Sequence, residues 1–182
     1  MTVRARGGLG IVPGRTQQHG YLWRRPIRRH DLESRLDAAH RPYHRAIAEE
    51  LESIRARFGC ALLLDCHSMP PPAAGTPPIV FGDCHGRTAA SWLTRDAEVI
   101  AGRVGFAAQS NAPFAGGHVV ERHGAPSANI HAIQIEIDRR CYLDERLRDP
   151  GDGFDQVSRL IEALAVELGD ALLSRSFATA AE

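Results

Sequence analysis

Lysine is absent from this chain, in which all 22 basic residues are arginine. The absence excludes Schiff-base chemistry and the phosphate-binding loop that depends on a lysine. Because 22 acidic residues balance the arginines, the formal net charge is zero, which argues against a general nucleic-acid-binding surface. We therefore expect no nucleic-acid partner.

Long apolar runs and paired cysteines are also missing. No apolar stretch approaches the roughly 20 residues that cross a bilayer, and no secretory leader is visible. The arginine-rich start has glycines and a proline within residues 7–13, so it makes a poor transit helix. The four cysteines form no CxxC pair and indicate reduced thiols. We expect a cytoplasmic protein with no membrane partner.

Helical and extended patterns alternate along the chain. An apolar stripe over residues 31–58 predicts a helix that Pro42 divides and Gly59 ends. Further patterns predict helices at 88–104 and 154–173 and strands at 60–66, 79–81, 106–109 and 131–138. This alternation favours one α/β domain over residues 1–182, with a mostly parallel or mixed sheet flanked by helices. The basic run of residues 23–29, WRRPIRR, is either an anion-binding patch or a solvated approach to the first helix.

The most informative segment is 61–69, ALLLDCHSM, an apolar strand that ends in polar residues. Asp65 and His67 are two positions apart, so in extended chain they point to the same side. A carboxylate beside an imidazole can fix its tautomer or share a cation with it. The alternative is a hydrogen-bonded turn without a ligand. Cys66 is a poor partner for a His67 base because neighbouring strand positions face opposite sides.

Glu136 lies within HAIQIEID, residues 131–138, the most regular alternation of the chain. Its isoleucines take one face, and Gln134, Glu136 and Asp138 take the other. A buried carboxylate needs a cation, a donor cluster or a solvated cleft. Glu136 is therefore either half of a structural ion pair with an arginine or the proton carrier of a metal-assisted hydrolysis.

The segment 114–126, FAGGHVVERHGAP, adds two glycines that permit close backbone approach, followed by Arg122. An arginine in a cleft can hold a substrate carboxylate through two parallel hydrogen bonds or stabilise an oxyanion. The alternative is a surface salt bridge. His118 and His123 are five positions apart in an expected loop or strand, a spacing that fits no common pair of metal ligands.

Five segments together resemble the N-formylglutamate amidohydrolase (N-formylglutamate deformylase) family. They are GLGIVP at 8–13, RPYH at 41–44, LLLDCHSMP at 62–70, GGHVVERHGAP at 116–126 and HAIQIEIDRRCYLDE at 131–145. The resemblance implies the phosphorylase/hydrolase-like fold of zinc carboxypeptidases and aspartoacylases. It also implies hydrolysis of N-formyl-L-glutamate, a small acidic N-acyl amino acid, to L-glutamate and formate in histidine degradation.

The resemblance assigns a role to three residues of this sequence. His67 corresponds to the family's later metal ligand, for a divalent ion that is usually zinc. Strand parity, independently of the resemblance, leads us to expect Asp65 in the second shell of His67. Glu136 corresponds to the general base. Arg122 matches a motif arginine near the substrate, with Arg139 and Arg140 as further choices for its two carboxylates.

The sequence departs from the family pattern at its start. Family members begin with an additional segment whose His-Ser-Gly motif and acidic residue supply the first two metal ligands, and neither has a counterpart here. We therefore expect a fragment, a misassigned start or a remnant with lost activity. A catalytically inactive domain that binds an acidic metabolite or a partner is an alternative function. An aspartoacylase-like or succinylglutamate desuccinylase-like amidohydrolase is a further alternative. We also expect an exposed apolar sheet edge and little activity from the chain by itself.

Overall fold

A computed structural model describes residues 12–16 and 20–180, with side chains up to residue 176. By its internal contacts the chain divides into two compact units, Met1–Ile47 and Ala48–Glu182. Helix α3 (Arg41–Phe58) begins in the first unit and ends in the second. The expectations for residues 1–11, including most of the segment GLGIVP, lie outside the described residues.

The N-terminal unit combines a minimal hairpin with a helix. Strands β1 (Arg15–Thr16) and β2 (Gly20–Tyr21) pair antiparallel. Helix α2 (Arg29–Arg35), the π-helical turn η1 (Leu36–His40) and α3 then follow one another without a break. The predicted division at Pro42 takes the form of this π turn, in which the Arg41 N–H donates to Leu36 O just before the proline. Proline has no N–H to donate, so a local change of helical register fits at this point.

The C-terminal unit contains a four-stranded sheet in the order β3-β6-β4-β5. Strand β6 (Ile130–Asp138) is parallel to β3 (Ala61–Met69) and antiparallel to β4 (Ile79–Gly82), and β5 (Ala108–Ser110) is parallel to β4. The expectation of a mixed sheet flanked by helices is confirmed. Strand β3 is longer than predicted and continues through the polar residues to Met69.

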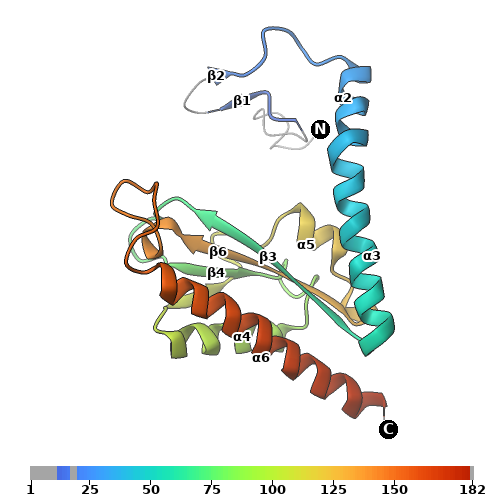
Figure 1. Cartoon of the computed structure of the whole chain (residues 1–182), viewed down its shortest axis with the longest axis vertical. Coiled ribbons are helices and arrows are strands. Elements are labelled where there is room, and N and C mark those ends of the chain that lie inside the picture. Colours follow the sequence, from blue (N-terminus) through green and yellow to red (C-terminus); the bar gives the residue numbers. More distant parts are fainter. Residues whose placement is uncertain (1–11, 17–19, 181–182) are drawn as a thin grey trace. The chain divides into compact units, whose positions relative to one another are not determined.

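Helices cover both faces of this sheet (Figure 1). Ile133, Ile135 and Ile137 of β6 face α4 (Ser91–Val104) and α6 (Phe154–Ala180) in the main core, because they pack with buried leucines of both helices. The opposite face meets α5 (His118–His123), where Val120, Ala132, Leu63 and Cys84 form a smaller cluster. The alternation of β6 therefore separates an apolar face from the face that carries its polar residues.

Two glycines set the turns that lead to this polar face. Gly59 has φ of 79° and donates its N–H to Arg55 O, so it ends α3 as predicted and turns the chain into β3. Gly116, with φ of 125°, precedes α5, and a Cβ at this position would lie 2.8 Å from Cys84 Sγ. A larger residue at Gly116 would be strained in conformation as well as crowded.

Candidate active site

Four polar side chains share one face of the sheet in the C-terminal unit. The parallel pairing of β3 and β6 places Asp65 opposite Gln134 and His67 opposite Glu136. Paired residues of neighbouring strands lie on the same face, about 4.8 Å apart along the hydrogen-bonding direction. The structure thus brings together three of the residues singled out from the sequence, Asp65, His67 and Glu136, and adds Gln134.

Asp65 and His67 face each other across 3.0 Å, measured from His67 Nε2 to Asp65 Oδ2. The Asp65 side chain is 12% exposed and that of His67 is 47% exposed. Within the described part of the chain, the buried Asp65 Oδ2 accepts no hydrogen bond, because the imidazole is close but not aligned to donate one. A buried carboxylate oxygen without a donor carries a large desolvation cost, which a bound cation would offset.

Glu136 is half-buried, and burial raises the pKa of its carboxyl group. His67, a hydrogen bond from Gln134 Nε2 at 2.7 Å, and the Arg139 guanidinium all favour the ionised form and oppose this rise. The Asp65 carboxylate adds to the rise in the pKa. A carboxyl group with a raised pKa holds and releases a proton nearer to neutrality, which is the property that a general base needs.

The segment around Arg122 differs from the expected loop or strand, since residues 118–123 form the short helix α5. Arg122 is exposed on this helix, whereas His123 is buried. Burial and the Arg122 charge lower the pKa of His123, and the Asp65 carboxylate opposes that effect. His123 therefore lies close enough to Asp65 to sense its charge, a proximity that the spacing of the histidines in the sequence did not reveal.

Two further arginines follow β6 and have different partners. Arg140 donates from Nε to Asp138 Oδ2 at 2.9 Å, and the ion pair raises the pKa of the Arg140 guanidinium. Arg139 instead donates from Nε to Ser68 Oγ at 3.2 Å, and its charge favours ionised Glu136. Of these two arginines, Arg139 is the one whose charge acts on Glu136.

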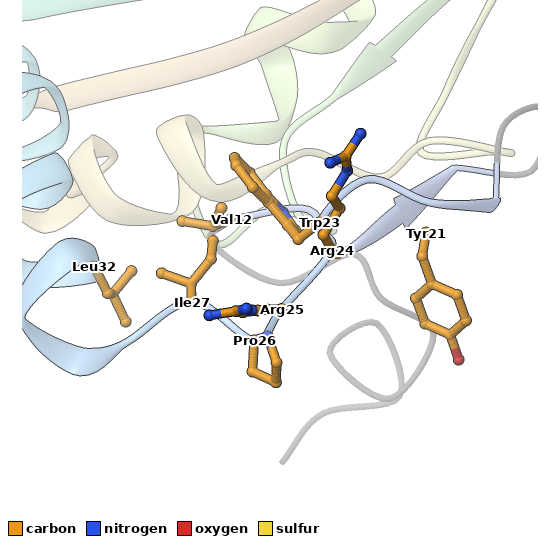
Figure 2. A pocket seen from close by; sticks show the side chains of 9 residues that line it. Val12, Tyr21, Trp23, Arg24, Arg25, Pro26, Ile27 and Leu32 are labelled. Atoms are coloured by element: carbon orange, nitrogen blue, oxygen red, sulfur yellow. The ribbon is translucent and has the colours of Figure 1, made fainter.

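Several cavities of the described part of the chain are lined by residues that the sequence singled out. A cavity of about 370 Å³ is lined by Cys66, His67 and Ser68 of β3 together with residues of α6. A larger cavity of about 680 Å³ lies in the N-terminal unit, where Trp23, Arg24 and Arg25 of the basic run line it with apolar residues (Figure 2). The indole Nε1 of Trp23 donates to Pro13 O at 2.7 Å, and the Arg35 guanidinium stacks over the indole ring. Part of the basic run thus contributes to local packing.

The N-terminal unit also contains two imidazoles that could bind a metal ion. His40 and His44 are one helical turn apart, their ring centroids are 4.4 Å apart, and they have ligand nitrogens within 4.8 Å of one another. Two histidines at this spacing on one helix face are a recognised pair of metal ligands. Of the two, only His44 was part of a segment singled out from the sequence, as the last residue of RPYH at 41–44.

The fold and the polar face together define an α/β protein with a histidine and a carboxylate on adjacent strands of a mixed sheet. A sequence model of the family "N-formylglutamate amidohydrolase" matches residues 1–143. The chain belongs to this family, which confirms the resemblance.

Named relatives agree with the family assignment. The chain is 37% identical over 111 residues to the N-formylglutamate deformylase of Pseudomonas aeruginosa and 34% identical over 116 residues to that of Pseudomonas putida. These matches span 58% and 60% of this chain but only 42% and 43% of the relatives. The crystal structure of N-formylglutamate amidohydrolase from Ralstonia eutropha superposes with a TM-score of 0.83 at 25% identity, over 94% of this chain and 64% of that one. The chain thus spans about two fifths of the curated relatives that it matches.

Among the described residues, no helix combines the length and the apolar character needed to cross a membrane.

Proposed function

We propose that the protein carrying this chain hydrolyses N-formyl-L-glutamate to L-glutamate and formate with the help of a divalent metal. Family membership and the names of both Pseudomonas relatives support the reaction. The observation that carries the proposal is the pairing of His67 with Glu136 across adjacent strands. We further propose that the reaction takes place in the cytoplasm, as a step of histidine degradation.

The donor atoms of the polar face suit a divalent ion such as zinc. His67 Nε2 and the orphaned Asp65 Oδ2 are an imidazole nitrogen and a carboxylate oxygen that face each other. His67 would be the ligand. Asp65 would orient the ring from Nε2 and leave Nδ1 for the ion, or would touch the ion itself. When bound, such an ion lowers the pKa of water toward about 7 and polarises the formyl carbonyl group.

Glu136 would carry the proton of the reaction. Its carboxylate would accept a proton from the attacking water and return it to the amine of glutamate as the C–N bond breaks. Because burial raises its pKa, Glu136 is a stronger proton acceptor than an exposed glutamate.

The two carboxylates of the substrate would be held by arginines. Arg122 remains our first choice because its exposed guanidinium on α5 is next to His123, which senses the polar face. Arg139 is the second choice because its charge acts on Glu136. Each can pair with a carboxylate through two parallel hydrogen bonds. Arg140, held by Asp138, is the weaker candidate.

A binding role for an acidic metabolite is the second candidate function. The polar face of the C-terminal unit supplies two facing ligand atoms, whereas a catalytic zinc site normally has three protein ligands. An ion held by fewer ligands would be lost more easily, and the arginines would then still attract an anion.

The deciding experiment measures formate release from N-formyl-L-glutamate by the purified chain, with and without added Zn²⁺. We expect slow, zinc-dependent release that Glu136→Gln abolishes. Release that the Gln variant leaves unchanged would refute Glu136 as the proton carrier. Complete absence of release, combined with saturable binding of N-formyl-L-glutamate in a calorimeter, would instead support the binding role.

A further inference from the structure

Gln134 is a buried amide in the middle of β6, with only 6% of its surface exposed. The pairing places it between Asp65 on β3 and Gly82 on β4. An amide buried in a sheet is costly unless its donor and acceptor atoms have partners. The contacts at its two ends therefore indicate what this side chain does.

The nitrogen end of Gln134 contacts Glu136. Its Nε2 donates to Glu136 Oε1 at 2.7 Å, a short distance typical of a hydrogen bond to a carboxylate. A carboxylate only accepts hydrogen bonds, so the amide must turn its NH₂ group toward Glu136 and its oxygen away. One oxygen of Glu136 is thus occupied, and the other is left for exchange with water or substrate.

The oxygen end of Gln134 lies against the backbone that leads into α5. A Cβ added to Gly117 would lie 2.8 Å from Gln134 Oε1, closer than a real Cβ contact allows. Only glycine leaves room for the amide oxygen at this position. Gln134 thus lies between Glu136 on one side and the Gly117 backbone on the other.

The backbone beside Gly117 is itself held against the sheet. The Cys84 N–H donates to Ala115 O at 2.6 Å. A Cβ on Gly82 would lie 2.6 Å from Gly116 N, so the loop rests directly on the strand next to Gln134. A loop held this close to the sheet limits how far the side-chain amide of Gln134 can move away from Glu136.

We propose that Gln134 is a positioning residue that fixes Oε1 of Glu136, is braced from behind by the Gly117 backbone, and leaves Oε2 as the proton-exchanging oxygen. This inference rests on the proposed function for its catalytic meaning. The inference adds Gln134 and Gly117 to the site. It predicts that a substitution at Gly117 disturbs Glu136 although the two residues are not in contact through the new side chain.

The test compares Gln134→Leu, Gly117→Ala and the control Gly102→Ala. The Leu variant removes the donor, and the Gly117 variant displaces the amide through a methyl group. Gly102 lies in α4, where an added Cβ meets nothing within 4 Å, so its variant controls for a methyl group elsewhere. Formate release gives kcat and KM, and the side-chain NH₂ resonance of Gln134 reports the hydrogen bond directly.

We expect Gln134→Leu and Gly117→Ala to lower kcat by roughly 10- to 100-fold with little change in KM, because hydrogen bonds to charged groups contribute on this scale. Gly102→Ala should leave both constants unchanged. If Gln134→Leu and Gly117→Ala kept the kcat of the parent, as Gly102→Ala should, the inference would be overturned.

The resonance experiment separates this inference from the proposed function. Glu136→Ala, which removes the acceptor, and Gly117→Ala should each shift the Gln134 NH₂ resonance, whereas Gly102→Ala should not. If the chain releases no formate but the resonance shifts as expected, the proposed function fails and the bracing stands. A resonance that neither substitution moves would show that Gln134 does not hold Glu136.

Discussion

Asp83 and Asn111 hydrogen-bond to each other in both directions, although they are 28 residues apart in sequence. Asn111 Nδ2 donates to Asp83 Oδ1 at 2.8 Å, and the Asp83 backbone N–H donates to Asn111 Oδ1 at 3.2 Å. Asp83 also accepts from Gly86 N and from Thr94 Oγ1. This network ties the end of β4 to the loop that leads into α5, and so fixes the backbone beside the polar face.

Replacing Asp83 should destabilise the C-terminal unit. Asp83→Ala removes the carboxylate acceptor of three hydrogen bonds, one of them from the buried Thr94, and we expect a loss of about 2–3 kcal/mol in the free energy of unfolding. Thr94→Val, which removes a longer bond of 3.3 Å to the same carboxylate, should cost less. Urea unfolding of both variants measures the difference. An Asp83→Ala variant within about 0.5 kcal/mol of the parent would contradict a structural role for the network.

Zinc-binding measurements should distinguish the role of His67 from that of Glu136. We expect His67→Ala to weaken zinc binding at least about 10-fold, because it removes a ligand, and Glu136→Gln to leave binding nearly unchanged. Titration calorimetry gives both affinities. His30→Ala removes an exposed histidine of α2 and is the control. Zinc affinity lost in the Gln variant and kept in the His67 variant would reverse the two roles.

Arg122 should determine the preference for a second substrate carboxylate. Arg122→Gln is expected to raise KM for N-formyl-L-glutamate about 10- to 100-fold, since a hydrogen-bonded charge pair is lost. For N-formyl-L-glutamine, which has an amide in place of the side-chain carboxylate, the same substitution should matter much less. Arg139→Gln is the comparison, and a loss of discrimination only in that variant would move the role to Arg139.

His131 should make the stability of the fold sensitive to acid. Burial lowers its pKa, and its Nδ1 accepts the Ala90 N–H at 3.2 Å, which requires a neutral ring. The unfolded chain therefore binds this proton more tightly than the folded chain. Stability should fall as pH drops through about 6.5 toward the lower folded value.

A neutral replacement at His131 tests this pH dependence. The midpoint of the unfolding transition should change less between pH 7 and pH 5 for His131→Gln than for the parent. This holds however much stability the substitution itself removes at neutral pH. His30→Gln, in an exposed position, should keep the pH dependence of the parent. Parallel curves for the parent and His131→Gln would refute the assignment.

The face of the sheet that carries the site was predictable because strands alternate with a period of two. Parity alone placed Asp65 and His67 on one side of β3 and Glu136 on the polar side of β6. The roles of these residues remain predictions. Their adjacency was not predictable from parity, since it depends on the pairing of strands about 70 residues apart, which no local pattern specifies.

Short elements and loop contacts were not predictable from the sequence, for a different reason. Helix α5 has only 6 residues, too few to display a helical repeat, and two glycines precede it. The link between Asp83 and Asn111 joins two loop positions with no periodic signal. Gln134 stood in the correct polar row, but its hydrogen bond to Glu136 depends on side-chain orientation.

The position of β6 inside the sheet and of β3 at its margin gives the two halves of the site different local stabilities. Strand β6 is hydrogen-bonded on both sides, whereas β3 has β6 as its one neighbour among the described strands. Backbone amides of β6 should therefore exchange with deuterium more slowly than those of β3. Glu136 then lies on the more rigid of these two strands, and we expect the strand of His67 to open more readily and to adjust to whatever it binds.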